Sequence, residues 1–452
     1  MESSPNITTL PIPRIPGHPV LGHLQALRHD RTAVQLRVAR EQPDIARLRV
    51  GFVPAVMIGA PALAHEVLAT KQASFAKAPG LSIFLRPLLG NGLLTSEREV
   101  HATQRKLIAP AFAHKRISAY ASTMAARSER FAASLADGHV FDVTEGIMRL
   151  TLEIVGKTLF DAEVGSDADA VGDAVTVAME CAMSQLSSLV PIPPFVPTAT
   201  NRRNRRAVAR LDEIVYRIIR ERRAQGSDRG DLLSMLLETK DEDGGTMTDR
   251  QIRDESMTLF LAGHETTANA LSWTLYLLAR NPAARARLEA EVDALGHVPS
   301  YDDLKQLPWT LAVVKEAMRL YPPAYILARR VLENVVIGRH QLKKYTIVLI
   351  NVLGIHRRPD LFPNPEAFDP SRFEGDAEKS WPRCAYMPFG AGPRICIGNH
   401  FALMEGHVVL ASLLKRLRFD LVNDRPVELD PLVTLRPKGG IQMRVTVREP
   451  SA

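Results

Sequence analysis

The stretch FGAGPRICIG, residues 389–398, decides the fold, and it runs directly into NHFALME, residues 399–405. A loop rich in glycine and proline carries one cysteine, Cys396, just before a segment with helical apolar periodicity. Three glycines remove side chains around the sulfur, so the backbone can approach a flat, bulky group closely. The following helix N-terminus and Arg394 both favour a negatively charged sulfur. A thiolate in this position is either a nucleophile or a metal ligand.

A second stretch, residues 248–280, predicts one long helix. Thr248 and Gln251 have capping-box spacing, apolar residues recur with helical period, and an Asn-Pro pair ends the pattern. Such a helix is about 48 Å long and must cross the body of the molecule. Its middle, AGHETT at residues 262–267, combines poor helix formers with back-bonding hydroxyls, so we expect a local distortion there. A packing groove would explain the two small residues, but not an acid and two hydroxyls.

The remaining segments predict a mostly helical chain with a few short strands. The sequence predicts helices at about 30–41, 97–112, 282–295 and 308–321, a run of helices over 140–240, strands at 47–50, 55–58, 335–338 and 346–351, an irregular apolar segment over 78–95, and a closing hairpin over 429–447.

The two stretches resemble motifs of the cytochrome P450 family. Phe-Gly-x-Gly-x-Arg-x-Cys-x-Gly resembles the family's haem-ligand loop, in which the cysteine thiolate is the proximal iron ligand. Ala-Gly-x-Glu-Thr-Thr resembles its oxygen-activation segment. Two further motifs follow the family's order, His101-x-x-x-Arg105 and Glu316-x-x-Arg319. Four separated motifs together make the resemblance specific.

The resemblance implies the fold: mainly α-helical, with a large helical domain and a smaller β-rich region. That β-rich region should comprise approximately residues 44–60, 325–352 and 429–448. Haem b should lie between the long central helix and the cysteine-led helix, within a single haem domain that spans residues 1–452.

The resemblance also implies roles for individual residues. Haem would be bound by Cys396 as the metal ligand, with His101, Arg105, Ala262, Gly263, Arg329, His356, Phe389 and Arg394 around it. Arginines 105, 329 and 394 would hold the propionates, and Arg330 is the alternative to Arg329. Thr266 and Glu265 would deliver protons to dioxygen. The substrate pocket would include Leu81, Ile83, Phe84, Phe260, Ala324, Ile326 and Leu327. Glu316, Arg319 and Arg372 would form a buried structural triad.

The implied activity is insertion of one oxygen atom of O2 into an apolar small molecule by hydroxylation or epoxidation. The sequence leaves the substrate open among fatty acids, terpenes, steroids and polyketide-like molecules. Three other functions stay open: a peroxide-driven peroxygenase, a non-catalytic haem-binding sensor or carrier, and a cysteine hydrolase. The acid–threonine pair argues against a peroxygenase, because family members of that type replace it.

Charge and composition bear on the partners. The chain carries a net charge of +7 and contains no nucleic-acid motif. Three cysteines fit a reducing compartment, and the N-terminal segment lacks a membrane anchor, so we expect a monomeric cytoplasmic protein of the soluble bacterial kind. The sequence shows no flavin- or nicotinamide-binding segment after the haem domain, so we expect no fused reductase. Electrons from NAD(P)H should therefore arrive through an acidic ferredoxin or flavodoxin with its reductase. The predicted docking residues are Arg105, Lys106, Lys115, Arg116 and Lys415.

Overall fold

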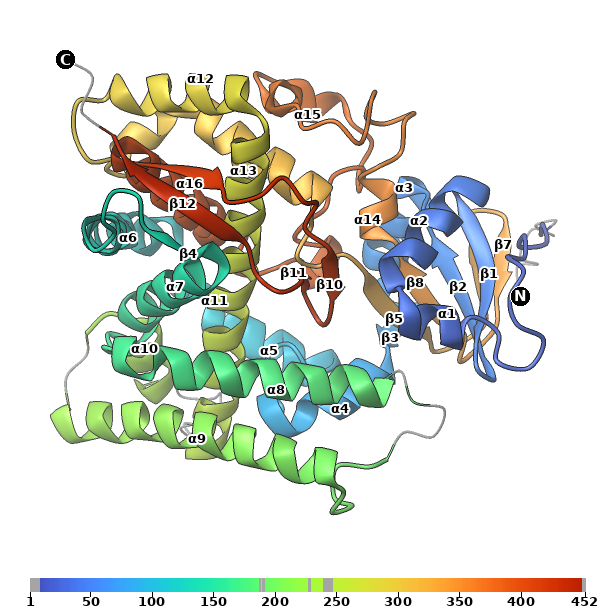
Figure 1. The fold of residues 1–452 in the computed structure, drawn as a ribbon. Coiled ribbons are helices and arrows are strands. Elements are labelled where there is room, and N and C mark those ends of the chain that lie inside the picture. Colours follow the sequence, from blue (N-terminus) through green and yellow to red (C-terminus); the bar gives the residue numbers. More distant parts are fainter. Residues whose placement is uncertain (1–8, 187, 189–191, 227–228, 239–246, 449–452) are drawn as a thin grey trace.

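The computed structural model describes residues 9–186, 188, 192–226, 229–238 and 247–448. Helices, short 3-10 and π segments included, account for 57% of the described residues, which confirms the predicted mainly α fold. Figure 1 shows most of the helices on one side of the molecule, and the largest sheet with a few shorter helices on the other, next to the N-terminus. The largest sheet therefore marks a smaller lobe beside a large helical one. The strands within 429–448, which the prediction assigned to the same β-rich region, belong to other sheets.

The central helix is α11, Asp249–Arg280, and Thr248 and Gln251 close the predicted capping box at its start. It packs against α7 (Val143–Phe160), α13 (Pro308–Leu320) and α16 (Asn399–Arg416), so it is buried along most of its length. The expected distortion is not found, because α11 is α-helical throughout. The Thr266 and Thr267 hydroxyls donate to the Ala262 and Gly263 carbonyls at 2.7 and 3.1 Å without interrupting the main-chain bonds.

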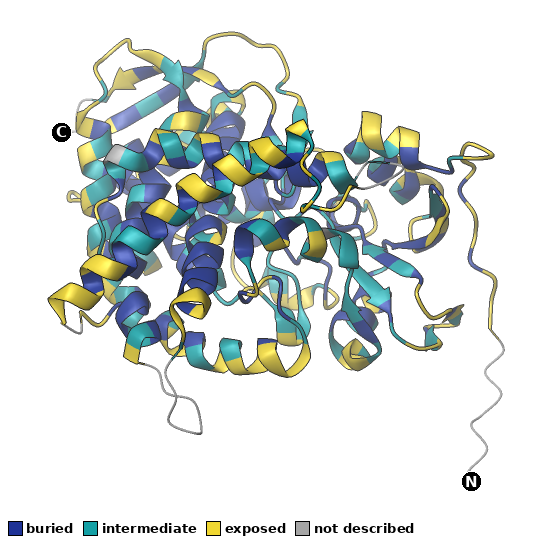
Figure 2. Ribbon diagram, turned by 90° about the horizontal axis from the view of Figure 1, so that it is seen from below, coloured by how far each residue is buried: buried dark blue, intermediate teal, exposed yellow. Residues whose placement is uncertain are grey.

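The other helices lie around this axis or beside the largest sheet. They are α1 (Leu24–His29), α2 (Arg31–Glu41), α3 (Pro61–His65), α4 (Pro79–Leu89), α5 (Arg98–Ile108), α6 (His114–Ala133), α8 (Ala168–Leu186), α9 (Ala199–Gln225), α10 (Leu232–Glu238), α12 (Pro282–Asp293), α14 (Val352–Ile355) and α15 (Ala377–Ser380). Figure 2 shows their outward residues exposed and their inward residues buried. No helix in the described part of the chain combines the length and apolar character needed to span a membrane.

Helix α4 corrects the prediction of an irregular segment over residues 78–95. Pro79 occupies the first turn, where a missing N–H costs nothing, and Gly90 ends the helix with a φ of 55°. Leu85, Leu88 and Leu89 are buried at helical spacing. The glycines that suggested a loop lie at the ends of this helix rather than in its middle.

The largest sheet has the order β1-β2-β8-β5-β3, with β2 and β8 parallel and the other neighbours antiparallel. Its strands are β1 (Ile45–Val50), β2 (Val53–Ile58), β3 (Phe75–Lys77), β5 (Leu327–Val331) and β8 (Ile347–Ile350). A separate hairpin joins β6 (Val335–Ile337) to β7 (His340–Leu342).

The C-terminal segment is more complex than the single hairpin predicted over residues 429–447. Strands β10 (Leu429–Pro431) and β11 (Leu435–Pro437) form one short hairpin. Strand β12 (Gln442–Val447) instead pairs with β9 (Leu417–Leu421) and β4 (Val140–Asp142). Thr434 and Leu435, at the turn of the β10–β11 hairpin, bond to side chains of α11.

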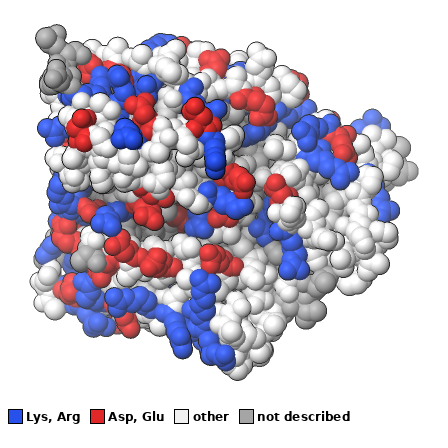
Figure 3. Space-filling model, in the orientation of Figure 1, with Lys and Arg blue, Asp and Glu red and all other residues white. Residues whose placement is uncertain are grey.

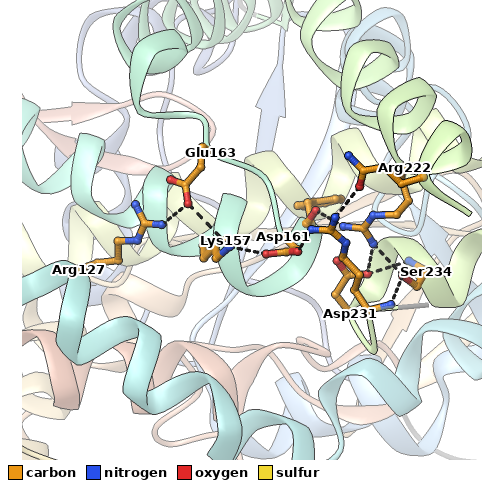
Figure 4. A network of polar contacts seen from close by, with 10 residues as sticks. Arg127, Lys157, Asp161, Glu163, Arg222, Asp231 and Ser234 are labelled. Atoms are coloured by element: carbon orange, nitrogen blue, oxygen red, sulfur yellow. Dashed lines mark hydrogen bonds and ion pairs between the residues drawn. The ribbon is translucent and has the colours of Figure 1, made fainter. Parts of the chain in front are cut away.

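A polar network fixes one end of α9 to α7 and α10 (Figure 4). Arg222 is buried and donates to Asp231 at 2.7 Å, to the Ser234 hydroxyl at 2.7 Å and to the Phe160 carbonyl at 2.8 Å. Lys157 pairs with Asp161 at the same junction. Removing one partner of a buried pair is costly, so this end of α9 is firmly held.

Candidate active site

The Cys396 loop folds around its own backbone. The Cys396 N–H donates to the Phe389 carbonyl at 2.9 Å, which places Phe389 directly beside the cysteine. Gly392 has a φ of 69°, and a Cβ there would lie 2.0 Å from the Leu68 carbonyl oxygen, so only glycine fits. The loop is thereby pressed against residues 68–69, and its path before the cysteine is fixed.

Accessible side chains near this loop indicate an internal space beside it. The Cys396 side chain is accessible, although protein surrounds it closely enough for burial to raise the pKa of its thiol. Ala262 is accessible and Thr266 partly so, while most of α11 around them is buried. Residues four apart share a helix face, so Ala262 and Thr266 border one space. Accessible residues on buried elements indicate room for a large group.

The raised pKa of Cys396 corrects one expectation. The sequence suggested that the helix terminus and Arg394 would stabilise a thiolate. Burial outweighs these effects, although the Gly398 N–H and Arg105 do lower the thiol pKa. A bound metal deprotonates a coordinating thiol by its own charge, so the loop does not have to do so alone.

Cationic side chains converge next to this space from four elements. Arg105 lies on α5, Arg329 on β5 and Arg394 in the cysteine loop, and Lys77 on β3 lies opposite Arg329 in the strand register. Burial and these four cations lower the pKa of His101 to about 4. Burial and Arg394 lower the pKa of Lys77 to about 7 and that of Arg329 to about 10. The mutual repulsion shows that the cations lie close together.

Among the described residues, these four cationic side chains are offset by two carboxyl groups. Glu97 pairs with Arg394, and Glu255 acts on Lys77. Burial raises the pKa of Glu255 to about 7 and lowers that of Lys77 to about 7, so each of these two opposite charges is partial. The cluster thus lacks about two negative charges, which a dianionic ligand would supply. The two propionates of haem fit this requirement.

Lys77 is a member of this cluster that sequence reasoning missed. Its ammonium group donates to the Leu93 and Ser96 carbonyls at 3.2 and 2.9 Å, so it ties β3 to the segment before α5. Nothing in the sequence around Lys77 marks it, because the strand register alone brings it next to Arg329.

The same register separates the two candidate arginines. Arg329 lies with Arg394 and His101, as their effects on its pKa and on that of His101 show. Side chains alternate along a strand, so Arg330 points to the opposite face of β5. The structure therefore places Arg329, and not Arg330, in the cation cluster.

His356 does not lie in this cluster, which corrects its predicted contact with haem. It is fully buried, its Nε2 accepts from the Met387 N–H at 2.9 Å, and its ring stacks on Tyr386. Burial and Arg319 lower its pKa to about 3, so it stays neutral. His356 supports the segment that leads to the cysteine loop instead.

Two predicted site residues of α11 pack against α7. Gly263 allows close packing against α7, because a Cβ there would lie 3.0 Å from the Val155 side chain. Phe260 is 2% exposed and packs edge-to-face on Phe160, since it lies two positions before Ala262 and so on the other side of the helix. Ala262 and Thr266 border the internal space, and Phe260 serves helix packing. Gly263 packs on α7 but is half-buried, so its place beside the haem stays a prediction.

The other predicted pocket residues have mixed positions. Leu327 lies near the cysteine loop, 3.6 Å from the position of a Cβ on Gly390, whereas Ile326 packs against the cluster between the large sheet and α2. Ala324 and Phe84 are half-buried, and Ile83 is exposed. The side chain of Leu81 lies outside the described residues.

The predicted triad is assembled as expected. Arg319 and Glu316 are fully buried and pair at 2.7 Å, and Arg372 approaches Glu316 at 3.5 Å. Arg319 also donates to the carbonyls of His356, Pro365 and Ala367. It therefore connects α13 to the segments that precede the cysteine loop.

The site is that of a thiolate-ligated haem protein. Its cysteine faces an internal space, small and hydroxyl-bearing residues border that space on α11, and an uncompensated cation cluster suits two carboxylates. Comparison with known proteins agrees, because the family model "Cytochrome P450" matches residues 13–444. The chain belongs to the cytochrome P450 family, whose members are haem-dependent monooxygenases.

Several relatives are similar over nearly their whole length. Cyclooctatin synthase of Streptomyces melanosporofaciens is 37% identical over 428 residues, which cover 93% of this chain and 91% of that protein. Cyclooctat-9-en-7-ol 5-monooxygenase of the same organism is 34% identical, covering 88% and 87%. Pentalenene oxygenase of Streptomyces avermitilis is 31% identical, covering 96% of each chain.

The two arginines of β5 provide a matched test of the cation cluster. We expect Arg329→Ala to speed haem loss about tenfold, because a charge-assisted bond to a propionate disappears. Arg330→Ala should change the rate less than twofold, since its side chain points away. Transfer of haem from each variant to an apo-globin scavenger measures the rates. Equal rates for the two variants would contradict this assignment.

Proposed function

We propose that this protein inserts one oxygen atom of O2 into a C–H or C=C bond of an apolar terpene, with electrons from separate redox proteins, and that residues 1–452 form one haem domain. The observation that carries the proposal is the accessible Thr266 hydroxyl on the face of α11 that borders the internal space, next to a buried acid. Three relatives with names that refer to terpenoid compounds support this substrate class.

Each residue has a distinct task in this proposal. Cys396 holds haem, which when bound supplies the activation of dioxygen. Lys77, Arg105, Arg329 and Arg394 neutralise its propionates. Ala262 leaves space above the reacting face, Thr266 orients a proton-carrying water with its hydroxyl, and Glu265 supplies protons.

The alternatives account for fewer features. A haem sensor or carrier needs the cysteine and the cations, but no hydroxyl and acid at the internal space. A peroxygenase has no need of a proton relay for O2. A cysteine hydrolase requires a histidine base, and in the described part of the chain the groups that act on the thiol are the Gly398 N–H and Arg105.

A titration with terpenes tests the proposed substrate class. Pentalenene and cyclooctat-9-en-7-ol, taken from the names of two relatives, should shift the haem absorption from low spin to high spin, because an apolar ligand displaces water. Oxygenated product should then form with a ferredoxin, its reductase and NADPH. Shifts with fatty acids of matched size, and none with terpenes, would contradict the proposed class.

Thr266→Ala is the control that separates an oxygenase from a carrier. This variant should bind the same terpene with unchanged affinity, yet yield about tenfold less product per NADPH, with hydrogen peroxide released instead. Thr267 is the next residue and is buried, so Thr267→Ala should form product per NADPH within about twofold of wild type. Equal coupling in wild type and Thr266→Ala would remove Thr266 from the proposed proton path.

The redox partner is proposed to be an acidic ferredoxin or flavodoxin that docks near the cysteine loop. Of the five predicted docking residues, Lys106 and Lys115 are exposed. The other three are engaged within the fold: Arg105 donates to the Ile395 carbonyl at 2.8 Å, Arg116 to Gly230, and Lys415 to Val292. The docking surface is thus narrower than the sequence suggested.

Charge reversal tests this surface. We expect Lys106→Glu/Lys115→Glu to slow reduction by ferredoxin about tenfold at low salt, with a loss that shrinks as salt rises. Figure 3 shows a second group of basic side chains over α9, where Arg205 and Arg206 are exposed. The double variant Arg205→Glu/Arg206→Glu therefore carries the same charge change at a different place, and ferredoxin should reduce it at the wild-type rate. Equal effects of both double variants would indicate attraction by net charge alone.

A further inference from the structure

The β10–β11 hairpin is fastened to one stripe of the central helix. Glu265, Asn269 and Trp273 are spaced four residues apart, so they lie on a single face of α11. All three are buried, and all three bond to two consecutive residues of the hairpin, Thr434 and Leu435. This stripe adjoins the one formed by Ala262 and Thr266, which borders the internal space.

Thr434 is the centre of these contacts. Its hydroxyl donates to Glu265 Oε1 at 2.6 Å and accepts from the Asn269 side-chain amide at 3.2 Å. The indole N–H of Trp273 donates to the Leu435 carbonyl at 3.3 Å. A threonine hydroxyl has a single proton, and here that proton is directed at the Glu265 carboxyl.

The hairpin itself is held from two other directions. The Tyr325 hydroxyl donates to the Pro431 and Leu432 carbonyls at 3.1 and 2.8 Å, and the Leu435 N–H donates to the Pro323 carbonyl at 3.0 Å. Arg436 pairs with Asp430 across the hairpin at 3.0 Å. Thr434 therefore has a fixed position, and a side chain that bonds to it is fixed in turn.

This arrangement decides which oxygen of Glu265 carries a proton. Burial raises the pKa of Glu265, while Thr434 and Arg436 lower it, and the pKa stays above its usual value. Because Oε1 already accepts the Thr434 proton, the acidic proton of the neutral carboxyl belongs on Oε2. Thr434 does not contact Oε2, so the proton on Oε2 is free to be donated.

We propose that Thr434 is a positioning residue for Glu265: its hydroxyl binds Oε1 and so leaves the proton on Oε2, ready for transfer towards Thr266. This inference rests on the proposed oxygenase function, because only that function requires a proton donor here. Thr434 itself touches neither substrate nor cofactor in this proposal. It acts through the carboxyl that it holds.

Infrared spectroscopy of the haem-loaded protein tests the bond directly. The carboxyl C=O band that disappears in Glu265→Gln belongs to Glu265, and it should be present at neutral pH. In Thr434→Val, which keeps the shape but lacks the hydroxyl, this band should move to higher frequency, because a hydrogen bond to the carbonyl oxygen is lost. Thr434→Ser keeps the hydroxyl and should retain the wild-type band. An unmoved band in folded Thr434→Val, or no such band in wild type, overturns the proposal.

Turnover with pentalenene gives an independent readout. We expect Thr434→Val to bind pentalenene normally but to form about tenfold less product per NADPH than wild type. Thr434→Ser should form product per NADPH within about twofold of wild type. Glu265→Gln should form about a hundredfold less product per NADPH. Normal coupling in Thr434→Val, with an active wild type, overturns the positioning role alone. An inactive wild type would count against the proposed function, while the infrared shift would still report on Thr434.

Discussion

Cys396→Ser should yield a protein that neither shows the spectrum of a thiolate-ligated haem nor forms oxygenated product. A serine hydroxyl has a similar size, but it stays protonated at neutral pH and donates far less charge to iron. The loop itself should persist, because its shape depends on Gly392 against residue 68 and on the bond from the residue 396 N–H to the Phe389 carbonyl. Absorption spectra, haem content and product formation measure the effect.

A second cysteine supplies the control. Cys181 is buried on α8 and makes only a weak contact, from its sulfur to the Thr200 carbonyl at 3.7 Å. Cys181→Ala should keep the thiolate spectrum and most of the activity. If Cys396→Ser kept that spectrum while Cys181→Ala lost it, the ligand would have been assigned to the wrong residue.

Arg319→Leu should destabilise the fold by about 3–5 kcal/mol, the usual cost of removing one member of a buried ion pair. Its loss leaves Glu316 as a buried charge and removes donors from the carbonyls of His356, Pro365 and Ala367. A typical domain is stable by only about 5–15 kcal/mol, so this change removes a large share of the free energy of unfolding and should lower the yield of folded haem protein. Urea unfolding followed by circular dichroism, together with haem content, measures the effect.

An exposed pair on α7 and α8 is the matched comparison. Arg149 pairs with Asp169 at 2.6 Å, and their side chains are 53% and 82% exposed. Arg149→Leu should change stability by less than about 0.5 kcal/mol, because solvent screens exposed pairs. A similar small change in Arg319→Leu would show that the triad does not hold the cysteine loop in place.

The motifs anticipated the fold and the centre of the site for a physical reason. The glycines of the cysteine loop, the capping box of α11 and the pairing of Glu316 with Arg319 are local requirements, so they are legible in one short stretch. These predictions agree with the structure. The family relation then confirms the mainly α fold and the haem cofactor.

The residues that were wrongly assigned or missed have one thing in common: their contacts depend on packing between segments that are far apart in the sequence. Phe260 turns away from the internal space and packs on Phe160. His356 lies behind the cysteine loop. Lys77 enters the cation cluster, and Thr434 meets Glu265, only because strands and hairpins bring them there. None of these relations has a signature in the local sequence.

The most direct test of the central claim is the absorption spectrum of the haem-loaded wild-type protein, reduced under carbon monoxide. Sulfur coordination by Cys396 predicts the strongly red-shifted Soret band that thiolate-ligated haem shows in this state. A Soret band at the position typical of histidine-ligated haem, or a purified protein that takes up no haem at all, would contradict the account.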